Sequence, residues 1–99
     1  MSSYAQYEAE DGRLVILKEL TRQTDGRLNE TIMMRVLDAF GHRWSREKVR
    51  TEMRKLEEIG AVQLAEAGTI LIASITRAGL DHVERRSVIE GVARPSPEA

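Results

Sequence analysis

The period of the hydrophobic pattern changes at Gly60, and this change restricts the folds that the chain can adopt. Before it, apolar residues recur at i, i+4, i+7 and i+10 from Val49, which is the spacing of one apolar face of a helix. After it, apolar and polar residues alternate over 61–65, and a run rich in β-branched residues follows over 69–75. A short turn with a glycine separates these two runs. The sequence therefore predicts a helix that ends at Gly60 and a β-hairpin directly after it.

The helix before Gly60 has a capping residue and a neighbouring helix. Ser45 is placed as its N-cap, because a serine hydroxyl can accept a hydrogen bond from an N–H two or three residues further on. Upstream, 30–40 carries a broad apolar stripe, and Asn29 is placed to cap that helix. Only about four residues, ending at Trp44, separate the two helices. This spacing is typical of a helix-turn-helix, in which the second helix contacts DNA.

The two ends of the chain have weaker patterns. A first helix is expected over 5–23, but Gly12 lowers helix stability by about 1 kcal/mol relative to alanine, so the helix is also compatible with a start near Glu10. Thr76 is placed to cap a last helix over 77–86, and the two prolines after it predict an extended or disordered tail. The expected organisation is a frayed N-terminus over 1–9, one domain over 10–86 and a tail over 87–99.

The order helix, helix, helix, hairpin, helix describes an α+β chain that is mostly helical, and it resembles the winged helix-turn-helix. Residues 49–62, VRTEMRKLEEIGAV, are similar to a recognition helix that enters the first wing strand in regulators of the ArsR, MarR and PadR kind. Residues 70–84, ILIASITRAGLDHVE, are similar to a second wing strand that enters a closing helix. The short length and the GVARPSP sequence at 91–97 resemble small winged-helix proteins of Mu-like prophages. The resemblance implies a small transcriptional regulator that binds duplex DNA.

Basic residues gather on the helix before Gly60 and just ahead of it. From Arg43 to Lys55 there are six basic residues against two acidic ones. Arg46, Arg50 and Arg54 follow one another at i, i+4 and i+8, and like charges at this spacing cost a few tenths of a kcal/mol each. Because arginine is the commonest partner of guanine in the major groove, this row is expected to face DNA. The candidate DNA-binding residues are Arg43, Ser45, Arg46, Lys48, Arg50, Thr51, Arg54 and Lys55.

Other features of the charge distribution favour a different partner. The formal net charge is −1, whereas DNA-binding domains are usually basic. The wing of many DNA-binding winged helices carries Arg or Lys, but here the predicted hairpin tip, 66–68, is acidic and no base lies between Gly60 and Arg77. A solvent-exposed helix that carries charges of both signs would also account for the basic residues. The alternative is therefore a winged-helix module for protein interaction or assembly that does not bind DNA.

Aromatic and histidine residues have ordinary structural explanations. Trp44 is expected to anchor the turn against the first two helices, and His42 is expected to be a surface residue of that turn. The resemblance to winged-helix regulators implies a homodimer through the terminal helices, for which Tyr4 and Tyr7 offer part of a surface.

Several classes of function have no support in the sequence. There is no cysteine, and two separated histidines do not form a metal-binding pattern, so no metal or cofactor is expected. No nucleophile motif or glycine-rich phosphate loop is present, so the protein is not expected to be an enzyme. No apolar run approaches the ~18 residues of a membrane span, and no signal peptide is recognisable. A soluble cytoplasmic protein without a membrane partner is the expectation.

Overall fold

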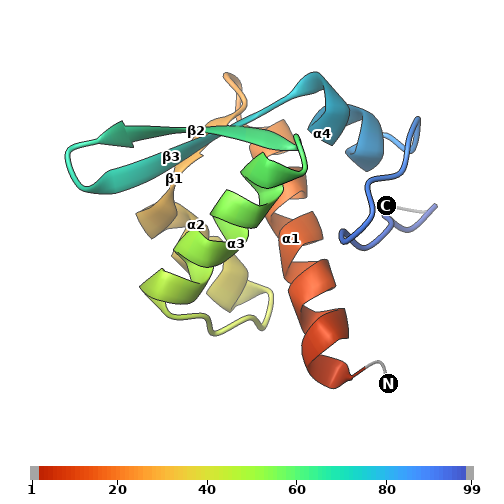
Figure 1. Cartoon of the computed structure of the whole chain (residues 1–99), viewed down its shortest axis with the longest axis horizontal. Helices are drawn as coiled ribbons and strands as arrows, with labels where there is room; N and C mark the ends of the chain where they lie inside the picture. The colour runs from red at the N-terminus through yellow and green to blue at the C-terminus, as the bar shows by residue number, and fades with distance from the viewer. Residues whose placement is uncertain (1–2, 98–99) are drawn as a thin grey trace.

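The structure, a computed structural model, describes residues 3–97 and is of the α+β class. About half of the chain is helical, and three short strands form one antiparallel sheet. In Figure 1 the sheet lies across the top, α2 and α3 lie below it, and α1 runs beside α3. The elements are α1 (Tyr4–Arg22), β1 (Arg27–Asn29), α2 (Glu30–Ala39), α3 (Arg46–Glu58), β2 (Val62–Ala67), β3 (Ile70–Ile75) and α4 (Arg77–Val83).

The sheet has the order β1-β3-β2, so the hairpin predicted after Gly60 is confirmed but is not the whole sheet. In the hairpin, Val62 pairs with Ile75 at one end and Ala67 pairs with Ile70 at the other. The expectation of a two-stranded sheet is wrong, because β1 pairs with the free edge of β3. A three-residue strand is too short to show an alternating pattern, and a neighbouring edge is what makes it a strand.

The predicted N-caps are confirmed. The side chains of Asn29, Ser45 and Thr76 each accept a hydrogen bond from the backbone N–H three residues further on. These caps set the starts of α2, α3 and α4, because the first N–H groups of a helix have no partner within it.

The first helix begins earlier than the boundary near Glu10 that the sequence allowed. It starts at Tyr4 and is capped by Ser3, so helix covers most of the segment that was expected to be frayed. Gly12 is buried in this helix because the ring of Trp44 packs directly over it. Residues 1 and 2 lie outside the described part of the chain.

The core lies between α1, α2, α3 and the inner face of the sheet. Its fully buried aliphatic members come from every layer and include Ile16, Leu17, Leu20, Met33, Leu37, Val49, Met53, Leu56 and Leu71. Within residues 3–97, no helix is long and apolar enough to cross a membrane.

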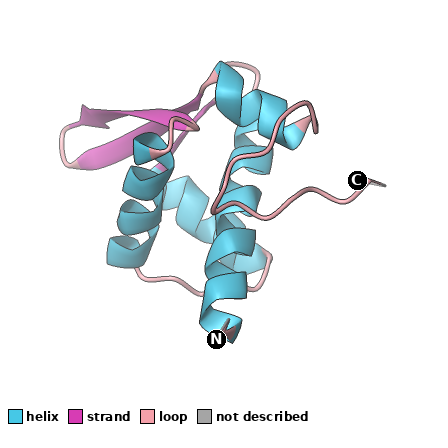
Figure 2. Ribbon diagram, turned by 45° about the vertical axis from the view of Figure 1, so that its right-hand side comes forward, coloured by secondary structure: helices cyan, strands magenta, loops and turns pink. Residues whose placement is uncertain are grey.

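The segment after α4 has no regular secondary structure but packs against the rest of the fold. It returns along α1 in Figure 2, and Val92 is almost fully buried in the core. The Ala93 N–H donates to the Glu10 carbonyl oxygen at 3.1 Å. On α4, the buried ring of His82 accepts a hydrogen bond from the Ile89 N–H at its Nδ1 atom, and its Nε2 atom lies 2.9 Å from the Ala93 carbonyl oxygen.

Candidate nucleic-acid interface

Trp44 anchors the turn before α3 against α1, one of the two helices that it was expected to contact. Its ring covers Gly12, and its indole N–H donates to Glu8 Oε2 at 3.2 Å. Lys48 Nζ also lies 5.2 Å from the centroid of this ring, within the range of a cation–π contact. Ser45 then caps α3. The beginning of α3 is therefore held in one position relative to α1.

His42 is not the surface residue that the sequence analysis expected. It is buried, and its ring nitrogens lie 3.3 Å from Glu8 Oε2 and 2.8 Å from Asp11 Oδ2. The two acids belong to α1, more than thirty positions away in the sequence. The pattern around the turn could not reveal them, because a helix stripe does not say which element will pack beside it.

The predicted row of arginines does not share one environment. Arg46 Nη1 lies 2.7 Å from Glu30 Oε2, and Arg50 Nη1 lies 3.0 Å from Glu30 Oε1. Arg50 also donates to the Thr69 carbonyl oxygen at 3.0 Å, and Glu30 accepts from the Leu71 N–H. Arg46 and Arg50 therefore join α2, α3 and β3 through one fully buried carboxylate.

Glu30 is kept ionised by these partners. Burial by itself raises the pKa of a carboxyl group, but the Leu71 N–H and the guanidinium groups of Arg46 and Arg50 outweigh it, so the pKa of Glu30 lies below its ordinary value. From the sequence, Glu30 was expected only to face the positive end of the helix dipole directly after the cap, and its contacts with Arg46, Arg50 and Leu71 were not foreseen.

A second buried carboxylate, Glu52, forms an ion pair with Lys48, another of the predicted DNA-binding residues. Glu52 Oε1 lies 2.6 Å from Arg13 Nε, and Glu52 Oε2 lies 2.7 Å from Lys48 Nζ. Burial raises the pKa of Glu52, and the hydrogen bonds and charges of Lys48 and Arg13 lower it by more, so its pKa is also below the ordinary value. Lys48 thus contacts both Trp44 and Glu52, and Arg13 links Glu52 of α3 to α1.

The depressed pKa values of Glu30 and Glu52 predict acid lability. A carboxyl group whose pKa is lower in the folded than in the unfolded state stabilises the fold above its unfolded pKa, and this stability is lost as the pH falls toward the folded pKa. We expect the midpoint of thermal unfolding, followed by circular dichroism, to hold near neutral pH and to fall steadily below about pH 4. A midpoint that stays level down to about pH 3 would contradict the ion pairs described for these two residues.

The remaining predicted residues face solvent. Thr51, Arg54 and Lys55 are exposed on the side of α3 that points away from the core, and they are called the outer face of α3 below. Neither Arg54 nor Lys55 forms an ion pair with any residue in 3–97. Arg43 is highly exposed just before the helix, and its Nε atom is 3.8 Å from Asp38.

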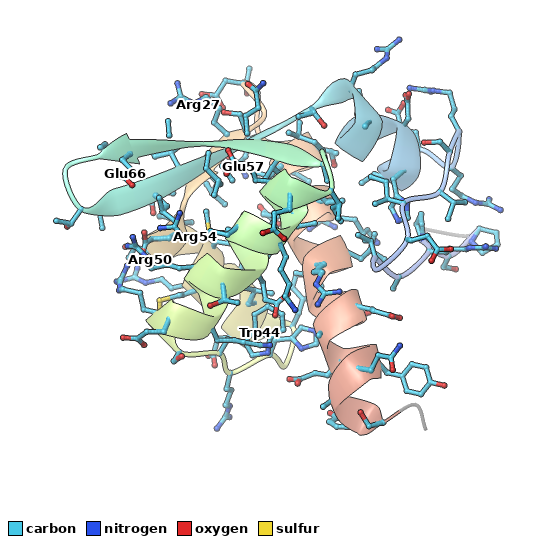
Figure 3. All side chains as sticks on the ribbon, in the orientation of Figure 1. Arg27, Trp44, Arg50, Arg54, Glu57 and Glu66 are labelled. Carbon is cyan, nitrogen blue, oxygen red and sulfur yellow. The ribbon has the colours of Figure 1, made fainter. Side chains whose placement is uncertain are left out.

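The hairpin adds acid rather than base to this region. Glu66 on β2 is exposed, and Glu57 at the end of α3 accepts a hydrogen bond from the Leu64 N–H at 3.1 Å. Figure 3 shows Arg50 and Arg54 below the hairpin, whereas Arg27 of β1 lies above the sheet. Arg27 therefore does not extend the basic surface of α3.

The comparisons with known proteins support a phage-like origin. Over 90 residues, the chain is 38% identical to the uncharacterized protein gp26 of Escherichia phage Mu, covering 91% of this chain and 93% of the relative. Over 79 residues, it is 35% identical to an uncharacterized protein of Haemophilus influenzae, covering 79% and 76% of the two chains. No protein-family model matches the chain, and no solved structure matches it significantly. The chain belongs to the family of the phage Mu protein gp26.

Proposed function

We propose that this protein is a winged-helix DNA-binding protein, a small transcriptional regulator that places α3 in the major groove of duplex DNA. The order of the elements supports the proposal, because α2, a short turn and a solvent-facing α3 are followed directly by a hairpin. The role is one of binding rather than catalysis.

The outer face of α3 is the observation that carries the proposal. Arg54 and Lys55 present cations with no acid partner among the described residues, and the exposed Thr51 lies beside them on the same face of α3. Such side chains suit contacts to phosphates, guanine and the thymine methyl group. Arg46 and Arg50 lie beside this surface and can add to the contacts with DNA. Glu30 orients both side chains, and 42% and 30% of their side-chain surface stays exposed.

Removal of the two free cations tests the proposal. We expect the double variant Arg54→Ala, Lys55→Ala to bind random duplex DNA about tenfold or more weakly at low salt, and to reduce the salt slope by about 2. Fluorescence anisotropy at low and then physiological salt measures both quantities. The matched control is Arg77→Ala, Arg94→Ala, which removes the same charge from exposed positions outside α3 and should have a much smaller effect.

Two results would contradict DNA binding by α3. One is no binding by the parent protein at low salt. The other is equal loss of affinity in the α3 variant and its control, because a non-specific attraction to total charge would then explain the binding.

Protein interaction or assembly is the second candidate function. The specific observation in its favour is acid around the outer face of α3, where Glu47, Glu58 and Glu66 are all exposed. A partner protein bound through an apolar surface would hardly respond to salt, whereas DNA binding falls steeply with salt because counterions are released. Salt dependence therefore separates the two candidates.

We also propose that the protein pairs with a second copy of itself. A two-fold pair would present two α3 helices, as dimeric DNA-binding proteins do when they bind palindromic half-sites.

A further inference from the structure

One side of α1 lies opposite the buried residues of the helix and carries partly or fully exposed side chains. Residues at helical intervals of three and four lie on the side opposite the buried Ile16, Leu17 and Leu20, and they are called the outer stripe of α1. The N-terminal turns that carry the start of this stripe project beyond the other elements in Figure 1. The outer stripe consists of Tyr4, Glu8, Asp11, Val15, Lys18 and Arg22.

The charges on the outer stripe are separated by sign. Glu8 and Asp11 lie in the N-terminal half, and Lys18 and Arg22 lie in the C-terminal half, with the apolar Val15 between them. If the helix is turned end over end against a copy of itself, Asp11 faces Lys18 and Glu8 faces Arg22. The midpoint between Glu8 and Arg22 is Val15, and the midpoint between Asp11 and Lys18 is the peptide bond just before Val15. The stripe is therefore complementary to itself in an antiparallel arrangement.

The middle of the stripe is apolar and slightly hollow. Leu14, Val15 and Phe40 line a shallow groove of about 160 Å³, and three charged residues of the stripe line the rest of it. Phe40, from the end of α2, leaves 55% of its surface exposed at this groove. An apolar centre with charged ends is the composition expected of a protein interface.

Three of the four charged residues of the stripe remain available to a partner, whereas Glu8 is 29% exposed and its Oε2 atom already contacts Trp44 Nε1 and His42 Nδ1. Lys18 has no ion pair with any residue that the structure describes. Asp11 contacts His42 through Oδ2, yet its side chain is 58% exposed. Arg22 contacts Glu19 through one nitrogen only and is 55% exposed. Each of these residues can therefore take part in a second ion pair.

We propose that two copies of this protein form a closed dimer by antiparallel packing of the outer stripes of α1 around a two-fold axis at Val15. Self-complementary charge identifies a second copy as the partner, because in a two-fold interface residue i meets residue j and residue j meets residue i. Phe40 of each copy packs beside the crossing point. This proposal rests on the pairing of two copies proposed above and names its surface on α1, and it does not depend on what α3 binds.

Charge reversal followed by mixing tests this interface. The oligomeric state of the full chain, without DNA, is measured by analytical ultracentrifugation over a range of concentrations. The variants Lys18→Glu and Asp11→Lys each place like charges opposite one another twice, so we expect each to dimerise about tenfold or more weakly. An equimolar mixture restores both pairs, Asp11 with Lys18 and Lys18→Glu with Asp11→Lys, and should form a heterodimer with about the affinity of the parent.

The double variant Asp11→Lys, Lys18→Glu provides the second arm. It exchanges the charges within one chain, so a homodimer should form again although each single change weakens it. Circular dichroism melting of all variants separates loss of the interface from loss of the fold, which matters because Asp11 also contacts His42. If Asp11→Lys unfolds the chain, Asp11→Asn replaces it in the mixture with Lys18→Glu. Asp11→Asn alone should weaken the dimer less than Lys18→Glu does.

A parent protein that stays monomeric at the highest concentration reached would overturn the proposal, and so would a dimer that Lys18→Glu leaves unchanged. Restoration by neither the mixture nor the double variant would also overturn it, because the pairing of Asp11 with Lys18 would then be wrong. Since DNA is absent from these measurements, a negative result here is independent of whether α3 binds DNA.

Discussion

Replacing Glu30 with alanine should lower the free energy of unfolding by about 2–4 kcal/mol. The side chain is fully buried and accepts hydrogen bonds from Arg46, Arg50 and the Leu71 N–H. Removing it leaves a buried N–H without a partner and two cations close together with no acid between them. We expect a loss of stability near the lower end of this range, because both arginines are partly exposed and water can solvate them after the change. For a domain of this size, thermal unfolding followed by circular dichroism should shift down by about 10–20 °C.

Two variants calibrate this result. Glu30→Gln keeps an acceptor for the Leu71 N–H but removes the charge, so its effect should lie between those of the parent and Glu30→Ala. Glu66→Ala removes an exposed acid from the hairpin and should change stability by no more than about 0.5 kcal/mol. Equal stability of Glu30→Ala and Glu66→Ala would show that the buried carboxylate does not join the three elements.

Replacing Gly12 with alanine should destabilise the protein by about 1–3 kcal/mol, although alanine is the better helix former. A Cβ at this position overlaps with the six-membered part of the Trp44 ring. The ring then has to move, which weakens its hydrogen bond to Glu8 and its contact with Lys48. Because Trp44 is the only tryptophan, its fluorescence spectrum reports the displacement directly, alongside thermal unfolding.

A double-mutant cycle separates the overlap from helix propensity. In a Trp44→Ala background the ring is absent, and Gly12→Ala should then stabilise the protein by up to about 1 kcal/mol. The sign of the effect is thus expected to reverse between the two backgrounds. The same destabilisation in both would mean that Trp44 is not what excludes a side chain at residue 12.

The local elements of the fold were predictable because their signals are local. Asn29, Ser45 and Thr76 cap the helices that the sequence assigned to them, and the change of period at Gly60 marks the transition from helix to hairpin. The strand β1 was missed, since three residues carry no period and depend on the edge of β3. Gly12 was read as a helix-weakening residue and suggested a late helix start. Its actual role is to make room for the ring of Trp44, which comes from a distant segment of the chain.

The candidate site was only partly predictable. The eight proposed DNA-binding residues do cluster at α3, but the row of arginines read as one surface is divided between two environments. Arg46 and Arg50 pair with a buried acid on α2, whereas Arg54 remains unpaired within residues 3–97. Spacing along one helix places residues on a side of that helix. The spacing gives no information about the charges on the neighbouring helix that packs against that side.

By itself the sequence determined the succession of helices and hairpin, the starts of α2, α3 and α4 and the concentration of basic charge around α3. Hydrophobic period and capping chemistry act within a few residues, so they can be read from neighbours in the chain. The tertiary structure decided which cations are neutralised by Glu30 and Glu52, which glycine lies beneath Trp44, and which side of α1 is left facing solvent. Those outcomes depend on the contacts between elements far apart in the chain, where burial makes each missing or added partner costly.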